Sequence, residues 1–312
     1  MGELKNEMGW SRTRVGTLHD CRRRYYYHYY QKWGGWSWNA PQNIQKTYFL
    51  TKLTSLPALV GDAVHRTIKK LLEQKIQYGR FVLEDPALFA RKELLTRTWL
   101  DSLAERWRKS PKKFPPMFET YYGELPSRER LKEFGAKTTR CLETFLQSDI
   151  AKELQEDDPK RWLAVDPDLS EAPELRFEGR KVYAIPDFAR RTTGGSVEIW
   201  DWKTGKPGEH DDLQLLSYAL YAQKHWMVGP DKIRLFAFYL DSDSEYSGVK
   251  EVPSSDESFE RIRSVIRDDF SLMDGLLADK EKNVPMAPDP HFPRIEEGPR
   301  CRYCNFKELC ER

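Results

Sequence analysis

Three residues in the stretch IPDFARRTTGGSVEIWDWKTGK, residues 185–206, have types and a spacing suited to phosphodiester chemistry. Asp201 and Lys203 are two positions apart, so they share one face if the segment is a β-strand. Asp187 lies upstream, across a Gly-Gly turn. Two facing carboxylates attract a hard divalent cation, and the adjacent lysine would be held in its charged form. Since a bound cation activates water and polarises a phosphoryl group, the pattern predicts metal-dependent phosphodiester hydrolysis.

This prediction depends on the register of a hairpin. If the turn is centred on Gly194, with Thr193-Gly194-Gly195 as an odd-length loop, Asp187 lies directly opposite Asp201. A two-residue Gly-Gly loop would shift the register by one and place the aspartates on opposite faces. The alternative interpretation is a surface hairpin with an ordinary salt-bridged lysine.

Cysteines near both ends of the chain form a second candidate site. Cys301, Cys304 and Cys310 have the spacing C-x2-C-x5-C, one thiol short of a four-ligand metal site, and Cys21 lies near the N-terminus. Cys141 stands among apolar residues at helical spacing and is expected to be a small buried hydrophobe. Because the N-terminus lacks the apolar stretch of a secretory signal, disulfides are not expected.

The composition predicts a soluble protein with a substantial core. The 312 residues are 39% hydrophobic and 32% charged, with a formal net charge of +2. No run of 18 apolar residues would form a membrane span, so the protein is expected to be cytoplasmic and to have no membrane partner.

Basic and aromatic residues are concentrated near the N-terminus, where Arg22, Arg23 and Arg24 precede five tyrosines within six positions. Such a mixture can hold phosphates and stack on bases, which would make nucleic acid a partner. The alternative is a helix whose tyrosines pack inward and whose arginines are solvated, and this stretch alone does not separate the two.

The order of predicted elements indicates an α/β fold. Helical patterns are found at residues 17–33, 57–76, 86–109 and 127–155. Extended segments follow at 174–191 and 196–205, then a helix at 210–226, a strand at 232–240 and a helix at 258–280. We expect a single domain over 1–312, with a mainly helical section at 17–160, an α/β catalytic core at 161–280 and a C-terminal segment at 281–312.

The central region resembles the PD-(D/E)xK nuclease superfamily, and specifically its RecB-like exonuclease branch. Pro186-Asp187 and the run Asp201-Trp202-Lys203-Thr204-Gly205 match the central motifs of that family. The resemblance implies a restriction-endonuclease-like core, a mixed sheet flanked by helices. Many relatives have Glu where this chain has Asp201, and either residue supplies an oxygen ligand.

The same resemblance assigns roles to further residues. His65, in a G-x-x-x-H context, would bind Mg²⁺ or Mn²⁺ together with Asp187 and Asp201. Lys203 would activate water or stabilise the transition state, and Gln214 and Tyr218 would position the lysine or the substrate. Glu174 would be an additional acidic contributor near the metal. Without the resemblance, His65 would be interpreted as a helix-surface histidine.

A subset of the branch, including the AddB-type nucleases and the CRISPR-associated RecB-like exonucleases, holds a [4Fe-4S] cluster. One cysteine precedes the nuclease core in these proteins and three follow it. The resemblance therefore implies an iron–sulfur staple held by Cys21, Cys301, Cys304 and Cys310, thiolates being the expected ligands. Zinc is the alternative metal, since four cysteines also make a tetrahedral site. A tail of unligated thiols is the third interpretation.

These observations lead to the expectation of a metal-dependent DNA nuclease, an exonuclease on single strands or DNA ends, with a role such as DNA repair. Arg22, Arg23 and Arg24 would contact DNA phosphates. No phosphate-binding GxxxxGK[ST] motif is present, so any helicase would be a partner. A non-catalytic nucleic-acid-binding or assembly subunit and an RNA-directed nuclease are the alternatives.

Overall fold

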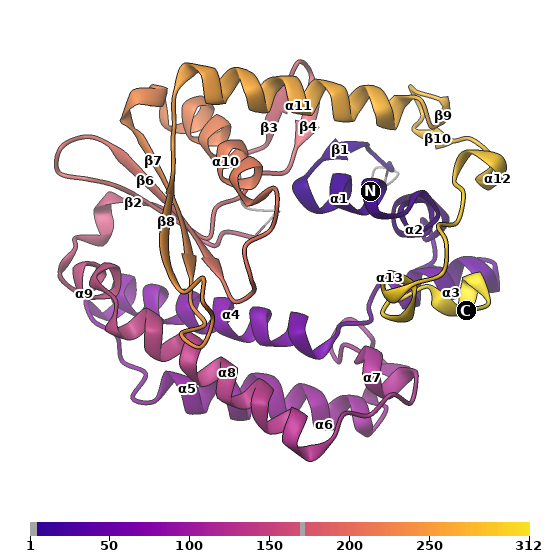
Figure 1. The fold of residues 1–312 in the computed structure, drawn as a ribbon, viewed down its shortest axis with the longest axis horizontal. Coiled ribbons are helices and arrows are strands. Elements are labelled where there is room, and N and C mark those ends of the chain that lie inside the picture. Colours follow the sequence, from indigo (N-terminus) through magenta and orange to yellow (C-terminus); the bar gives the residue numbers. More distant parts are fainter. Residues whose placement is uncertain (1–4, 169–171) are drawn as a thin grey trace.

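The computed structural model describes residues 5–168 and 172–312, and a five-stranded mixed sheet lies on the left in Figure 1. The strand order is β2-β5-β6-β7-β8, in which β6 and β7 are parallel and all other neighbours antiparallel. The strands are β2 (Trp162–Val165), β5 (Phe188–Arg191), β6 (Val197–Lys203), β7 (Ile233–Tyr239) and β8 (Gly248–Val252). The predicted α/β fold with a mixed sheet is confirmed.

The β5–β6 hairpin has the register that the chemical prediction requires. Arg191 is opposite Val197 and Phe188 is opposite Trp200, so the hairpin is centred on Gly194. One step beyond the last pair, Asp187 falls opposite Asp201. Gly195 has a φ of +84°, a left-handed conformation that glycine adopts without strain. The predicted odd-length loop is confirmed.

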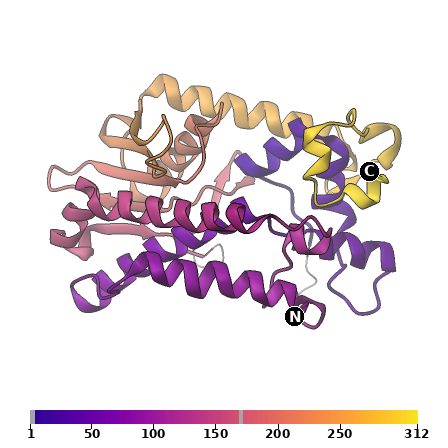
Figure 2. The same cartoon turned by 60° about the horizontal axis from the view of Figure 1, so that its bottom comes forward.

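Helices cover both faces of the sheet (Figures 1 and 2). Trp200, Trp202 and Phe238 pack with the helical section formed by α4 (Leu56–Tyr78), α8 (Arg128–Gln147) and α9 (Asp149–Glu156). On the opposite face, Ile199 packs with α10 (Asp211–Trp226) and α11 (Asp256–Asp274). Because both faces are buried, β7 reads as a near-continuous apolar run, IRLFAFY.

The helical section largely follows the sequence prediction. The helix predicted at 57–76 is α4, with Pro57 in its first turn and Gly79 as a left-handed C-cap. The predicted helix at 127–155 begins as expected after Ser127, but it is divided into α8 and α9 at Ser148, which caps α9 by accepting the N–H of Ala151. The other elements of this section are α3 (Gln42–Leu50), α5 (Pro86–Phe89), a π-helical segment (Ala90–Thr96), α6 (Arg97–Leu103) and α7 (Phe118–Tyr121).

The predicted single helix at 17–33 is wrong. Helix α1 (Arg12–Asp20) ends at Cys21, where the backbone is extended, and α2 (Arg22–Tyr26) and a π-helical turn (Tyr27–Gln31) follow. The Cys21 sulfur accepts the N–H of Arg24 at 3.5 Å and caps α2. The tyrosines of this segment mostly pack inward, Tyr25, Tyr27 and Tyr30 being buried, so they form core and not a base-stacking surface.

Helices α1 and α2 lie beside the C-terminal segment of the chain (Figures 1 and 2). Strand β1 (Gly9–Trp10) pairs with β4 (Arg180–Val182) of a small sheet that includes β3 (Leu175–Phe177). Trp10 donates to Asp269 of α11 at 2.8 Å. A hairpin of β9 (Leu277–Asp279) and β10 (Val284–Pro285) follows α11, and α12 (Pro288–His291) and α13 (Pro299–Arg302) lead to the C-terminus. Among the described residues, no helix has the length and apolar character needed to cross a membrane.

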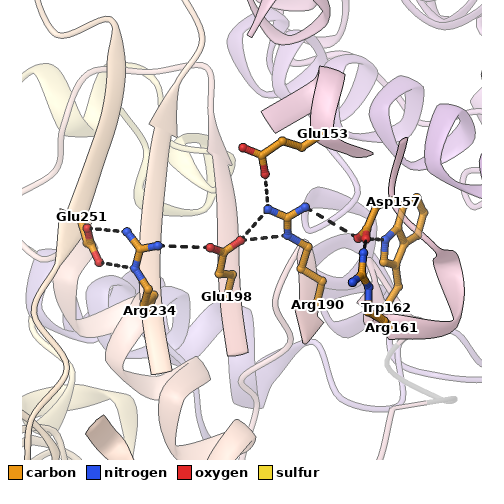
Figure 3. Close-up of polar contacts among 8 residues, drawn as sticks. All are labelled: Glu153, Asp157, Arg161, Trp162, Arg190, Glu198, Arg234 and Glu251. Carbon is orange, nitrogen blue, oxygen red and sulfur yellow. Dashed lines mark hydrogen bonds and ion pairs between the residues drawn. The ribbon is translucent and has the colours of Figure 1, made fainter. Parts of the chain in front are cut away.

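Alternating charges tie the strands together at the end of β6 remote from Asp201 and Lys203 (Figure 3). Arg190 of β5 is nearly buried and donates to Glu198 of β6 at 2.9 Å, and it also pairs with Glu153 of α9. Arg234 of β7 extends the network from Glu198, at 3.3 Å, to Glu251 of β8, at 3.0 Å. Each strand from β5 to β8 contributes one charge, so the network fixes the order and register of the sheet.

Candidate active site and cysteine-lined cavity

Asp187 and Asp201 lie next to each other where β5 begins and β6 ends. The Asp187 carboxylate accepts the backbone N–H of Trp202 at 2.8 Å, which fixes the side chain beside β6. Asp201 is 2% exposed. Burial, followed by the charge of Asp187, raises the pKa of Asp201, whereas Lys203 and His65 lower it. Two carboxylates held this close in a dry setting favour an added positive charge.

Helix α4 brings His65 to the same place. Gly61 lies one turn earlier on the helix, and a Cβ there would be 3.4 Å from the Thr204 hydroxyl, an ordinary contact distance, so the helix passes close to the end of β6. His65 Nδ1 is 3.4 Å from an Asp187 carboxylate oxygen. Burial lowers the pKa of His65, but the charges of Asp187, Asp201 and Asp166 outweigh burial and raise it to about 9. The surrounding carboxylates therefore favour the protonated form of the imidazole.

Lys203, Gln214 and Tyr218 form a closed hydrogen-bond circuit with Asp201. The Lys203 ammonium is 2.5 Å from an Asp201 oxygen and donates to the Gln214 side-chain oxygen at 2.7 Å. The Gln214 amide donates to the Tyr218 hydroxyl at 2.6 Å, and this hydroxyl donates to the second Asp201 oxygen at 3.3 Å. Burial lowers the pKa of Lys203, but Asp201 more than compensates, so the net pKa is raised and the lysine is charged.

Asp166 is a neighbouring acid that sequence reasoning missed. It follows β2, and its N–H donates to the Asp187 carbonyl at 2.7 Å. Burial and then the Asp187 charge raise the pKa of Asp166. Lys69 of α4 donates to the Asp166 carbonyl at 2.7 Å. The short strand WLAV before Asp166 was the only available signal, and it is too brief to identify from periodicity.

The other residues singled out from sequence lie elsewhere. Glu174 pairs with Lys181 at 2.9 Å and with Arg176 at 2.5 Å, on the small sheet. Arg23 is 7% exposed and its guanidinium is occupied by Asp289 and by the Phe292 carbonyl at 2.7 Å. The expectation that Arg23 contacts phosphates is therefore corrected, because its donors already join the two ends of the chain.

The carboxylate site suits a divalent cation by its donors. One Asp201 oxygen is buried and has no well-angled hydrogen-bond donor, although it contacts the Lys203 ammonium. The side chains stand as two adjacent pairs, His65 with Asp187 and Lys203 with Asp201. Within residues 5–168 and 172–312, no three His, Cys, Asp or Glu side chains are gathered tightly enough to hold a metal ion in the arrangement shown. A cation would bind here by separating these pairs.

Four of the five cysteines line one cavity. Cys21 contributes from the junction of α1 and α2, and Cys301, Cys304 and Cys310 contribute from the C-terminal segment. Burial, and in part the neighbouring thiols, raise the pKa values of Cys304 and Cys310. Cationic side chains also line this cavity: Arg24, Arg294, Arg300, Lys307 and Arg312. Among the described residues, however, no three of these thiols are gathered tightly enough to hold a metal ion in the arrangement shown. Cys141 is fully buried among apolar side chains, as predicted.

The structure thus has a mixed sheet covered by helices on both faces, with two acids and a lysine at the end of a central hairpin. The family model of the PD-(D/E)XK nuclease superfamily matches residues 9–311, and the chain belongs to this superfamily. Membership suggests a nuclease, implies a nucleic-acid substrate and makes a divalent metal the typical cofactor. No curated protein matches the chain.

Proposed function

We propose that the chain is a metal-dependent deoxyribonuclease of the RecB-like branch, an exonuclease that acts on single-stranded DNA or DNA ends. The observation that carries the proposal is the circuit of Asp201, Lys203, Gln214 and Tyr218 beside Asp187. A surface hairpin with an ordinary exposed ion pair would not leave Asp201 only 2% exposed. Nor would it hold Lys203 between the Asp201 carboxylate and the Gln214 side-chain oxygen. A subunit that had lost catalysis would have no need for this arrangement.

We expect the residues of the site to have different roles in metal binding, catalysis and positioning. Asp187 and Asp201 would hold Mg²⁺ or Mn²⁺, with His65 as a third donor. Such a cation would polarise the phosphoryl group and lower the pKa of a bound water. Lys203 lies where its ammonium can donate to a phosphate oxygen or orient the attacking water. Gln214 fixes the lysine, and Tyr218 holds one Asp201 oxygen.

We further propose a [4Fe-4S] cluster held by Cys21, Cys301, Cys304 and Cys310. The shared cavity and its cationic lining support an anionic cluster, and the cysteine order matches the pattern of the iron–sulfur branch. Arg22 and Arg24 are exposed next to this cavity and are the arginines that remain as candidate phosphate contacts. A helicase or another DNA-processing protein would be a natural partner, because this chain has no nucleotide-binding motif.

The test is a digestion time course on single-stranded DNA labelled at either end, with Mg²⁺, Mn²⁺ or EDTA. We expect metal-dependent degradation by the wild type and a loss of at least about a hundred-fold for Lys203→Ala. Lys206→Ala, an exposed lysine three positions on, is the matched control and should retain activity. Degradation of RNA alone would replace DNA as the substrate, and no degradation of either by metal-loaded wild type would overturn the proposal.

A further inference from the structure

The segment from Cys21 to Gly61 contains no aspartate or glutamate, although these residues number 49 in the 312-residue chain. It carries six cationic side chains: Arg22, Arg23, Arg24, Lys32, Lys46 and Lys52. Arg23 is neutralised by Asp289, and Lys46 by Glu308 at 3.0 Å. In the part of the chain that the structure describes, the other four have no carboxylate partner.

These charges are concentrated around His28. Burial and the charges of Lys32, Arg24, Arg14 and Lys52 lower the pKa of His28 to about 3. Burial, followed by Lys52 and Arg14, also lowers the pKa of Lys32, to about 8. Cations on α1, α2, the following turn and the end of α3 therefore share one region. A bound polyanion would relieve their mutual repulsion.

Exposed tryptophans lie in the same segment. Trp38 is 92% exposed and Trp36 is 43% exposed. The Trp36 ring packs edge-on against Trp33 at 5.0 Å and against Tyr48 of α3 at 6.0 Å. Lys52 lies 4.6 Å from the centre of the Tyr48 ring. The rings of Trp36 and Tyr48 and the Lys52 ammonium therefore lie together.

The loop that carries Trp38 is fixed to α3. The Gln45 side-chain amide donates to the carbonyls of Ser37, Trp38 and Ala40 at 3.3, 3.0 and 2.8 Å. Gly35 packs so closely on α3 that a Cβ there would lie 2.5 Å from the Ile44 carbonyl oxygen. A fixed loop thus holds the Trp38 indole out in water, where its face is accessible to a ligand.

We propose that Trp36, Trp38, Lys32 and Lys52 form a binding platform for single-stranded nucleic acid, separate from the catalytic carboxylates. The inference rests on the proposed function only in taking nucleic acid as the ligand. Unpartnered cations complement phosphates, and indole faces stack on bases that are not already stacked in a duplex. Exposed tryptophans would also suit a protein surface or an anionic bilayer, so the choice of a single strand rests on the nucleic-acid substrate that the family implies, together with the unpartnered cations.

The test measures binding in EDTA, so that catalysis does not interfere. A fluorescein-labelled oligothymidine of about 20 nucleotides is titrated with full-length protein and followed by anisotropy. Trp38→Ala should raise the Kd about five- to a hundred-fold. Met227→Ala removes an 86%-exposed apolar side chain after α10 and should leave the Kd unchanged. Because Trp38 is exposed, its variant should melt at the wild-type temperature.

The lysines are tested by salt dependence. Lys32→Gln combined with Lys52→Gln should reduce the slope of log Kd against log salt by about 1.4, the value for two phosphate contacts on a single strand. The double variant Lys224→Gln and Lys232→Gln, two exposed lysines outside the platform, should keep the wild-type slope.

Parallel titrations use polyglutamate and phosphatidylserine vesicles. Weakened oligothymidine binding together with a reduced slope supports the platform. Unchanged oligothymidine binding overturns it, and a loss confined to polyglutamate or vesicles assigns the surface to a protein or a membrane instead. Tight binding by a protein that degrades nothing would contradict only the proposed nuclease, whereas degradation with unchanged binding by the Trp38 and lysine variants would contradict only the platform.

Discussion

Lys203 is held from two sides, by the Asp201 carboxylate and by the Gln214 side-chain oxygen. Removing Gln214 would leave the lysine paired with Asp201 but free to rotate about that contact. Gln214 is therefore a positioning residue, since its influence on a phosphate would pass through the ammonium that it orients. Tyr218 acts on the other Asp201 oxygen in a comparable way.

Gln214→Ala should lower kcat about ten- to a hundred-fold while KM changes little, because the ammonium is misplaced in the reacting complex. The measurement is steady-state digestion of single-stranded DNA. Gln223→Ala is the control. Gln223 lies on the same helix, but its side-chain oxygen accepts a hydrogen bond from Arg263 of α11 at 2.8 Å and not from Lys203. A wild-type kcat for Gln214→Ala would show that Lys203 needs no second support.

Sequence patterns located the central residues because few and rigid elements position them. A glycine turn fixes Asp187 opposite Asp201, and one helical turn separates Gln214 from Tyr218. Asp166 and Arg23 escaped these patterns. Each is defined by contacts with residues distant in sequence, Asp166 with Asp187 and Arg23 with Asp289, and no local periodicity encodes such contacts.

At the scale of elements, helix breaks and short strands were not predictable from the sequence. Ser148 and Cys21 interrupt apolar patterns that continue on both sides, because each side chain caps the next helix instead of extending the first. Strands β2 and β8 have four and five residues and acquire their order from the sheet. Longer elements such as α4 and β7 were predictable because their own apolar patterns span the whole element.

Arg190→Ala should destabilise the sheet strongly, by about 3 kcal/mol in the free energy of unfolding. The substitution leaves the buried Glu198 without its closest partner and removes a contact of Glu153 (Figure 3). Urea denaturation measures the change. Arg234→Ala, whose side chain is 50% exposed, should cost less than about 1 kcal/mol. Equal losses for the two variants would mean that burial does not set the strength of this network.

His28 should make the folded state sensitive to acid. Its pKa is lowered to about 3 in the folded protein, whereas an unfolded histidine titrates near 6.5. Between these values the unfolded chain binds a proton that the folded chain does not, so stability falls as the pH falls from 6.5, by at most about 1.4 kcal/mol per pH unit.

His28→Phe tests this, because the aromatic packing on Tyr29 and Phe306 is kept while the titrating group is lost. Urea denaturation at several pH values between 6.5 and 4.5 should give a shallower loss of stability for the variant than for the wild type. Parallel curves for the two proteins would exclude His28 as the source of acid sensitivity.

At the scale of the whole molecule, the proposed cluster joins ends that already touch. Cys21→Ser should lower bound iron from about four per chain, and it should reduce the melting temperature, since a group that binds only the folded state stabilises it. Iron analysis and thermal melting of anaerobically purified protein check both. The Cys141→Ala variant should keep the wild-type iron content, because Cys141 is buried in the core between the helical section and the sheet. Colourless wild-type protein with one zinc per chain would reject the cluster in favour of zinc.

The meeting of the two ends also has a consequence for synthesis. Trp10 and Arg23 are synthesised long before their partners Asp269, Asp289 and Phe292. A nascent chain can assemble its sheet and helical section while its first residues wait for these contacts. A product truncated before Asp289 would lack both partners of Arg23 and would leave Tyr26 without the Phe292 ring, 5.1 Å away, against which it packs. The N-terminal segment can therefore complete its contacts only after synthesis has passed Phe292.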